Sequence, residues 1–275
     1  MVRLNRDCNI DFYVGTDIDG NKIPIPFEDI LISGYTNTGK SMFVHNLIQD
    51  ALLRYSENKI QFRIWSTLNE YDIWDVSQFT DGKRAIPGVK ITSYYEEPLC
   101  SRMESFESFL ESISSMVLRR YETLKECGVK NIWEYIRTEE SRASNMVPTV
   151  CIIDEWSEDL SDKSRECFTD IKKYGRATGV IMIWVAHSQQ LIYDGWHPKQ
   201  FCNNFLSRFL FYTSSEDSDA IIGSTYCAST QNRGVGRGMC IYQRGNLPYI
   251  PMDIPKFSYS LGKKIARALS QEVHD

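Results

Sequence analysis

The amino-acid sequence predicts an α/β fold in which a mainly parallel sheet carries helices on both of its faces. Short apolar runs alternate along the chain with segments whose apolar residues recur at helical spacing. A glycine-rich loop separates the first of these runs from the first helical segment. Strands that alternate with helices pair in parallel through right-handed crossovers. A chain of 275 residues, 42% of them hydrophobic, suits one large domain of this kind.

The predicted elements follow one another without an internal repeat or a low-complexity linker. Residues 30–33 are apolar enough for a strand that is buried on both faces, whereas apolar and polar residues alternate over 60–65. The helix over 106–126 ends at a Cys-Gly pair, which is a stop signal. The other predicted elements are helices over 42–55, 162–177 and 261–273, strands over 150–153, 180–186 and 208–212, and a hairpin over 239–252 that turns at Gly245 and Asn246.

We expect residues 1–275 to form a single domain, because no linker or shift in composition marks a boundary. Its core would span residues 29–212. Residues 1–28 would be a small β leader, and residues 213–275 would add a peripheral appendix, made of the hairpin and the C-terminal helix.

The glycine-rich loop has the pattern G-x-x-x-x-G-K-S of a phosphate-binding P-loop, or Walker A motif. Glycines let the backbone N–H groups of such a loop turn towards phosphate oxygens, and the N-terminus of the following helix adds a partial positive charge. We expect Lys40 to reach the β- and γ-phosphates of ATP, and Ser41 to ligate Mg²⁺. The predicted nucleotide-binding residues are Gly34, Tyr35, Thr36, Asn37, Thr38, Gly39, Lys40, Ser41 and Met42.

A second acidic motif follows the apolar run over residues 150–153 and is typical of a Walker B strand. Asp154 comes at the carboxyl end of this run, where ligands bind in parallel sheets. It is the predicted partner of Mg²⁺, through water. Glu155 follows directly and is placed to accept a proton from the attacking water. The pair therefore predicts hydrolysis of the nucleotide as well as binding.

Composition and the N-terminal residues narrow the class of protein further. No stretch approaches the ~20 apolar residues of a membrane-spanning helix, and the N-terminus does not lead into a signal-type apolar core. The eight cysteines lack the C-x-x-C spacing of a zinc site, so free thiols in a reducing compartment are the better interpretation. We therefore expect a cytoplasmic protein with no membrane anchor of its own.

Several stretches resemble the motor domain of the FtsK/SpoIIIE DNA translocases, which belong to the FtsK-HerA superfamily of P-loop ATPases. The sequence over 14–20 is similar to the family's leader, and 32–41 is similar to its Walker A segment. Residues 119–121 with 127–132 resemble the family's RRY…GVRN pattern, and 152–160 resemble its VDEFADL segment. The stretches over 175–180 and 207–215 resemble its ARAAGIH and TRIAF…SS segments.

This resemblance implies a RecA-like fold and a homo-oligomeric ring, usually hexameric. It also implies ATP at the subunit boundaries, double-stranded DNA in the central pore and a possible recruiting protein. By the same resemblance, Arg176 or Arg208 is the candidate for an arginine that meets the γ-phosphate bound by a neighbouring subunit, a role that suits a planar guanidinium. The alternative for either arginine is a structural ion pair.

The chain also departs from the family pattern. His187 stands where the family usually has a sensor glutamine; it is a candidate catalytic residue that can donate a hydrogen bond to phosphate or water, or it can merely cap the strand end. Trp65, Ser66 and Thr67 replace an Asp-Pro-Lys type of segment. The family's membrane spans, companion domain and winged helix have no counterpart in these residues.

The formal net charge of −5 is not that of a dedicated DNA-binding module, although a ring can concentrate positive charge at its pore. Residues 233–238 offer one basic, glycine-rich candidate for a DNA contact, and a hairpin approach is its alternative. Two other functions stay open. One is a protein-translocating ATPase of the type VII secretion kind, and the other is a nucleotide-binding switch subunit with little turnover.

Overall fold

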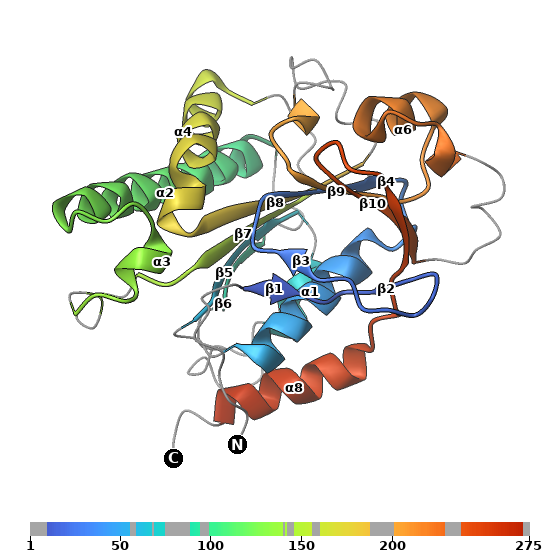
Figure 1. The fold of residues 1–275 in the computed structure, drawn as a ribbon, viewed down its shortest axis with the longest axis horizontal. Coiled ribbons are helices and arrows are strands. Elements are labelled where there is room, and N and C mark those ends of the chain that lie inside the picture. Colours follow the sequence, from blue (N-terminus) through green and yellow to red (C-terminus); the bar gives the residue numbers. More distant parts are fainter. Residues whose placement is uncertain are drawn as a thin grey trace.

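A computed structural model describes residues 10–55, 59–67, 69–74, 89–93, 99–139, 141, 146–155, 160–187, 201–228 and 238–271. Its main feature is a nine-stranded sheet in the order β2-β11-β10-β9-β4-β8-β7-β5-β6 (Figure 1). From β9 to β6 the neighbouring strands pair in parallel, whereas β10, β11 and β2 extend the sheet by antiparallel pairing. The expected mainly parallel α/β fold is therefore confirmed.

The strands are β1 (Asp11–Phe12), β2 (Thr16–Asp17), β3 (Ile25–Pro26), β4 (Ile30–Gly34), β5 (Gln61–Ser66), β6 (Val89–Ser93), β7 (Thr149–Asp154), β8 (Val180–His187), β9 (Ser207–Leu210), β10 (Met239–Arg244) and β11 (Ile250–Asp253). The α-helices are α1 (Lys40–Arg54), α2 (Leu99–Glu126), α3 (Ile132–Tyr135), α4 (Asp162–Thr178), α6 (Ser215–Ile222) and α8 (Tyr259–Gln271). Two 3₁₀ helices, η1 (Asn69–Trp74) and η5 (Tyr226–Ala228), complete the described elements.

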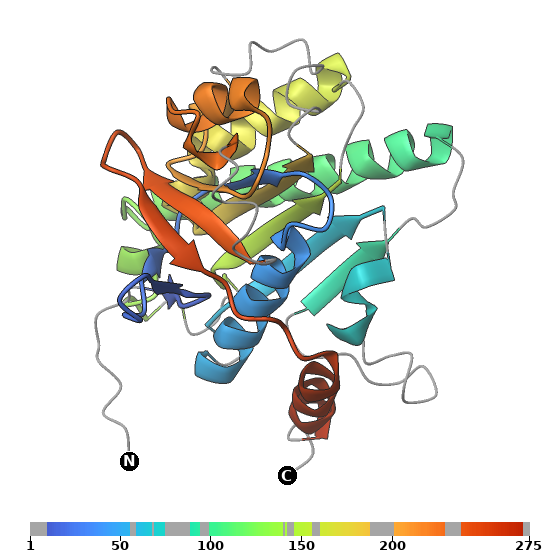
Figure 2. The same cartoon turned by 90° about the vertical axis from the view of Figure 1, so that its right-hand side faces the viewer.

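Each face of the sheet has its own hydrophobic core, because successive residues of a strand point to opposite faces. In β4, Ile30 and Ile32 pack with α1, η1 and the segment that leads to α8. Leu31 belongs to the opposite core, which holds α2, α4 and α6. Figure 2 shows the two layers of helices on either side of the sheet. The near-continuous apolar character of β4, β7 and β8 follows from burial on both faces.

The helix boundaries follow from local chemistry. At the start of α4, the Ser161 hydroxyl accepts a hydrogen bond from the backbone N–H of Ser164, and at its end Gly179 adopts the left-handed conformation. A Cβ atom on Gly179 would lie 2.5 Å from Ile132, so the helix end and α3 pack too closely for a larger residue.

The predicted strands and helices that fall on described residues are present, with ends that differ by a few residues. Elements η1, β6, α3, α6 and η5 were not predicted from the sequence. The hairpin within the expected appendix of residues 213–275 is present as β10 and β11. Strand β10 pairs with β9 along four residue pairs, so the hairpin continues the main sheet. Pairing between distant segments leaves no local signal in the sequence.

In the described part of the chain, no helix is both long and apolar enough to cross a membrane. Residues 156–159, 188–189 and 233–237 lie outside the described residues. Parts of the Walker B resemblance, the positions after His187 and most of the basic glycine-rich segment fall there.

Candidate nucleotide-binding site

The register of the parallel strands gathers the candidate residues at one edge of the sheet. Strand β8 lies between β4 and β7, with Gly34 opposite His187 and Asp154 opposite Val185. Because β4, β7 and β8 all end at this edge, the P-loop, the acidic pair and His187 meet there. This is the edge at which open α/β sheets bind their ligands.

The P-loop needs glycine at two positions for reasons visible in its backbone. Gly34 has φ 149° and Gly39 has φ 120°, values that other residues rarely adopt. A Cβ atom would lie 2.7 Å from the Phe211 Cβ at Gly34, and 3.1 Å from the Gly238 Cα at Gly39. Gly39 also forms the N-cap of α1 without a side chain. The first N–H groups of α1 are therefore open to an anionic ligand.

Lys40 is buried beneath the loop. Its ammonium donates to the carbonyl oxygens of Gly34 and Tyr35, each at 3.0 Å, and lies 3.5 Å from Nδ1 of His187. The Thr38 hydroxyl donates to the same Tyr35 carbonyl at 2.7 Å. The loop is thus folded around its own lysine, and a short movement of the side chain would direct the ammonium to phosphate oxygens.

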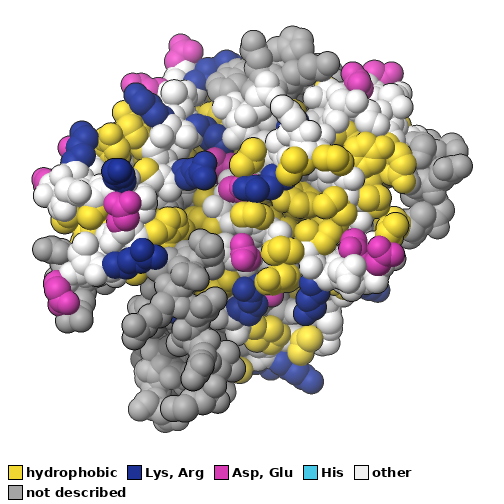
Figure 3. All heavy atoms as spheres, viewed as in Figure 1, with side chains coloured by type: hydrophobic (Ala, Val, Ile, Leu, Met, Phe, Trp, Pro, Cys, Tyr) yellow, Lys and Arg dark blue, Asp and Glu magenta, His cyan; other side chains and the backbone are white. Residues whose placement is uncertain are grey.

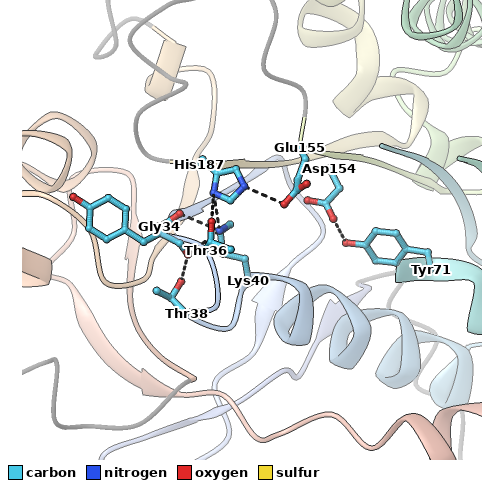
Figure 4. Close-up of polar contacts among 9 residues, drawn as sticks. Gly34, Thr36, Thr38, Lys40, Tyr71, Asp154, Glu155 and His187 are labelled. Carbon is cyan, nitrogen blue, oxygen red and sulfur yellow. Dashed lines mark hydrogen bonds and ion pairs between the residues drawn. The ribbon is translucent and has the colours of Figure 1, made fainter. Parts of the chain in front are cut away.

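His187 bridges the P-loop and the acidic motif (Figure 4). Its Nε2 lies 3.0 Å from Oε1 of Glu155, and its Nδ1 lies 3.5 Å from both the Thr36 hydroxyl and the Lys40 ammonium. An ammonium can only donate, so Nδ1 accepts and Nε2 carries the proton that is donated to Glu155. The neutral Nε2–H tautomer satisfies both contacts.

The backbone of Glu155 adopts a left-handed conformation with φ 61°. For a residue with a long side chain this conformation is uncommon and costs free energy, and such residues cluster at functional sites. The N–H of Glu155 donates to the Val185 carbonyl at 3.1 Å, which holds the residue against β8 after the ladder ends. This turn brings the carboxylate to His187.

Asp154 is buried at the end of β7, and its Oδ2 accepts a hydrogen bond from the Tyr71 hydroxyl at 2.6 Å. Asp154 and Ser41 offer a carboxylate and a hydroxyl oxygen, the kinds of ligand that Mg²⁺ prefers. The described residues contain no cluster of three or more His, Cys, Asp or Glu side chains that could hold a metal ion alone. This donor set fits Mg²⁺ that is held in part by phosphates and water.

A pocket of about 170 Å³ opens along the P-loop. Its lining residues are Thr36, Asn37, Gly39, Lys40, Ser41, Met42, Glu155, His187 and Tyr259. Eight of these nine residues were predicted from the sequence. The ninth is Tyr259, which lies in the first turn of α8. Tyr71 was not predicted either. Neither tyrosine lies in a motif, so no local signal could have found them.

The two candidate arginines lie apart from this pocket. Arg176 is exposed in the last turn of α4, at the opposite edge of the sheet. Strand β8 begins soon after it and runs eight residues to His187, or about 25 Å at ~3.3 Å per residue. Arg208 donates to the carbonyl oxygens of Ile221 at 2.7 Å and of Gly245 at 2.9 Å, and burial lowers the pKa of its guanidinium. These contacts give Arg208 a structural role within its own chain.

The fold is that of the RecA-like P-loop ATPases. No protein-family model matches the chain. A DNA translocase FtsK from Staphylococcus epidermidis is 25% identical over 244 residues, which cover 83% of this chain and 28% of the relative. The chain thus spans about a quarter of that protein's length, and the resemblance predicted from the motifs is confirmed over most of the chain.

Among the solved structures that share the fold, two illustrate the similarity. The cytoplasmic domain of the Thermomonospora curvata type VII secretion ATPase EccC aligns with a TM-score of 0.73 and 18% identity, over 98% of this chain and 32% of that one. The pCW3 conjugation coupling protein TcpA, in a monomer form with ATPγS, aligns with a TM-score of 0.67 and 16% identity, over 95% of this chain and 70% of that one.

Proposed function

We propose that the protein hydrolyses ATP and uses the energy to move double-stranded DNA. The observation that carries the proposal is the pocket in which Lys40, Ser41, Glu155 and His187 face one another. The lysine and the first turn of α1 bind the phosphates, and Glu155 accepts a proton from the attacking water. Ser41 and Asp154 would hold Mg²⁺, which would supply positive charge to offset that of the phosphates.

His187 couples the phosphates to the catalytic glutamate. Lys40 donates to two loop carbonyls and faces His187, so a triphosphate that draws the ammonium away changes the partner of Nδ1. The γ-phosphate or its water then takes the place of Lys40 beside the imidazole. Because Nε2 of the same ring contacts Glu155, the orientation of the glutamate depends on what lies in the phosphate site. This arrangement supports a sensor role for His187 like that of glutamine in the resembling family.

The motor part of the proposal rests on the FtsK relatives and on the likeness to a conjugation coupling protein. We infer a homo-oligomeric ring, usually hexameric in the resembling family, in which a neighbouring subunit completes the site. Arg176 is exposed and lies far from the pocket of its own chain, so it can meet a γ-phosphate only in trans. A planar guanidinium there would stabilise the charge of the transferring phosphoryl group. Arg208 is the weaker candidate because its guanidinium holds two carbonyls.

The surface charge fits a channel better than an external DNA groove. Figure 3 shows Lys and Arg side chains interspersed with Asp and Glu side chains and with apolar patches on the face viewed. The net charge of −5 also argues against a large basic surface on a single subunit. We therefore infer that the contacts with DNA phosphates come from residues that several subunits of a ring bring together at its centre.

The test is the rate of ATP hydrolysis with and without long duplex DNA. We expect duplex DNA to raise the rate of ATP hydrolysis in the wild type. We expect Glu155→Gln to abolish ATP hydrolysis while ATP still binds. The matched control is Glu126→Gln at the exposed end of α2, which should leave the rate unchanged. A rate that ignores duplex DNA would contradict DNA as the cargo, and equal slow rates in the wild type and Glu155→Gln would point to a nucleotide-binding switch.

A protein cargo is the second candidate, and the likeness to the type VII secretion ATPase EccC favours it. Under this alternative the ATPase chemistry is the same, but a polypeptide raises the rate instead of DNA. The same assay separates the two, because duplex DNA raises the rate of a DNA motor and not that of a motor with a protein cargo.

A further inference from the structure

The nucleotide pocket has one wall that the phosphate chemistry does not explain. The pocket is lined by the P-loop, Glu155 and His187, and also by Met42 and Tyr259. Triphosphate oxygens need N–H groups, ammonium and Mg²⁺, none of which an aromatic ring supplies. A nucleobase, by contrast, is a flat apolar surface that stacks well on such a ring.

We propose that Tyr259 is a base-stacking residue, on whose ring the nucleobase of the bound nucleotide lies. The inference rests on the proposed nucleotide binding and names the part of the ligand that α8 recognises. With the phosphates in the loop before α1, Met42 and Tyr259 are the lining residues that lie outside the G-x-x-x-x-G-K-S pattern and the Glu155–His187 pair, and they are left to meet the ribose and base.

The exposure of Tyr259 sets it apart from the aromatic rings around it. It is 46% exposed, whereas Phe257 is 3% exposed and His45, Tyr71 and Trp74 are buried. These rings contact one another in a single cluster beneath α8. Tyr259 is thus the member of the cluster that presents ring surface to the pocket, and a stacked base would cover apolar surface that water now contacts.

The ring of Tyr259 is held in place before any ligand binds. It packs edge-on against His45, with centroids 5.4 Å apart and planes at 71°, and against Phe257, at 5.2 Å and 83°. Edge-to-face packing of this kind is the favoured geometry for aromatic pairs. A ring held by its neighbours loses little side-chain entropy when a base stacks on it.

The segment before α8 is anchored to the P-loop helix, which holds Tyr259 beside the pocket. Figure 2 shows this segment crossing over α1 to reach α8. The Asn46 side chain in α1 donates to the Pro255 carbonyl at 2.8 Å, and Phe257 stacks on His45 of the same helix at 4.6 Å. Gly262 allows α8 to approach Phe257, because a Cβ there would lie 2.5 Å from that ring.

The experiment compares binding of ATPγS and of inorganic tripolyphosphate, both with Mg²⁺, by titration calorimetry on the full chain. We expect Tyr259→Ala to weaken ATPγS binding about tenfold, which lies within the range that loss of a base–aromatic stack gives. Tripolyphosphate binding should not change, since that ligand has no base. Tyr259→Phe should bind both ligands like the wild type, because the ring is kept.

The matched control is Tyr249→Ala, which removes a tyrosine that is 39% exposed and packs on Tyr226 away from the pocket. If Tyr259→Ala unfolds, Tyr259→Leu keeps apolar volume without a ring and should show the same selective loss. Equal weakening of both ligands, or no weakening of either, overturns the stacking role. If the wild type and Tyr259→Ala bind ATPγS equally well, the stacking role of Tyr259 is contradicted and the nucleotide-binding function is not. If the wild type binds neither ligand, the nucleotide-binding function is contradicted as well.

Discussion

His45 provides a prediction whose size can be worked from the structure. The side chain is fully buried in α1, where its Nδ1 accepts a hydrogen bond from the Trp74 indole at 3.0 Å. Its Nε2 is buried and has no hydrogen-bond partner among the residues that the structure describes. Burial lowers the pKa of His45 from its ordinary value of 6.5 to about 4. The folded protein therefore holds this imidazole neutral at a pH where the unfolded chain would protonate it.

The sign follows from proton linkage. Between pH 6.5 and pH 4 the unfolded state binds more protons at this site than the folded state, so the free energy of unfolding falls as the pH falls. The full contribution of His45 is about 3 kcal/mol, since one pKa unit corresponds to about 1.4 kcal/mol. It is present above pH 6.5. At pH 5, about 2 kcal/mol of it is lost.

The assay is urea unfolding of the wild type and His45→Gln, followed by tryptophan fluorescence at pH 7.5 and pH 5. Glutamine keeps an acceptor for the Trp74 indole but does not titrate. The other titrating groups are the same in both proteins, so their contributions cancel when the two pH differences are compared. We expect the wild type to lose about 2 kcal/mol more than the variant on acidification. Equal losses would refute the reasoning.

Three further predictions concern the site and its arginines. Tyr71→Phe removes the donor to Asp154 and should raise the Mg²⁺ concentration for half-maximal ATP hydrolysis several-fold, with ATP affinity unchanged; an unchanged Mg²⁺ requirement would contradict a positioning role. His187→Ala should lower kcat about 10- to 100-fold with little effect on KM. His187→Gln can still donate and accept hydrogen bonds and should keep most of the activity. Similar kcat values for the two variants would contradict the role of His187 in linking the P-loop to Glu155. Arg176→Ala should leave the free energy of unfolding unchanged and lower the rate of ATP hydrolysis on the order of 10³-fold. Arg208→Ala should lower the free energy of unfolding by about 2 kcal/mol, because the contacts of its guanidinium with two carbonyls are lost. If urea unfolding and rate measurements give the reverse pattern, Arg208 is the arginine that acts in trans and Arg176 is the structural one.

The parts of the site that the sequence predicted are those written in local patterns. Glycine positions with positive φ, a lysine at the start of a helix and an acidic pair at a strand end each depend on a few neighbouring residues. His187 could be placed because it ends an apolar strand that had to lie in the same sheet. Position at the carboxyl edge then followed from parallel pairing alone.

The parts that the sequence did not predict depend on contacts between distant segments. Tyr71 meets Asp154 across 83 positions, and η1 has no periodic apolar pattern that marks it. Tyr259 reaches the pocket only because the chain after β11 crosses α1. Arg208 stands in a stretch that resembles a known motif, yet its contacts with Ile221 and Gly245 arise from packing of α6 and the hairpin turn. Such contacts are decided by tertiary structure rather than by propensity.

The hairpin contacts the P-loop from about 200 positions away in the sequence. The N–H of Gly238, just before β10, donates to the Thr38 carbonyl at 3.1 Å, and the N–H of Ile254 donates to the Gly238 carbonyl at 2.8 Å. A Cβ atom on Gly39 would lie 3.1 Å from the Gly238 Cα, and one on Gly238 would lie 2.5 Å from the Ile254 carbonyl oxygen, so neither residue can carry a side chain without a shift. The same hairpin leads into the segment that presents Tyr259. One C-terminal unit therefore contacts the phosphate loop and also supplies Tyr259 to the lining of the pocket. A ligand that contacts both the phosphate loop and Tyr259 would stabilise the hairpin, the crossing segment and α1 together, and a movement of the hairpin would change the shape of the pocket.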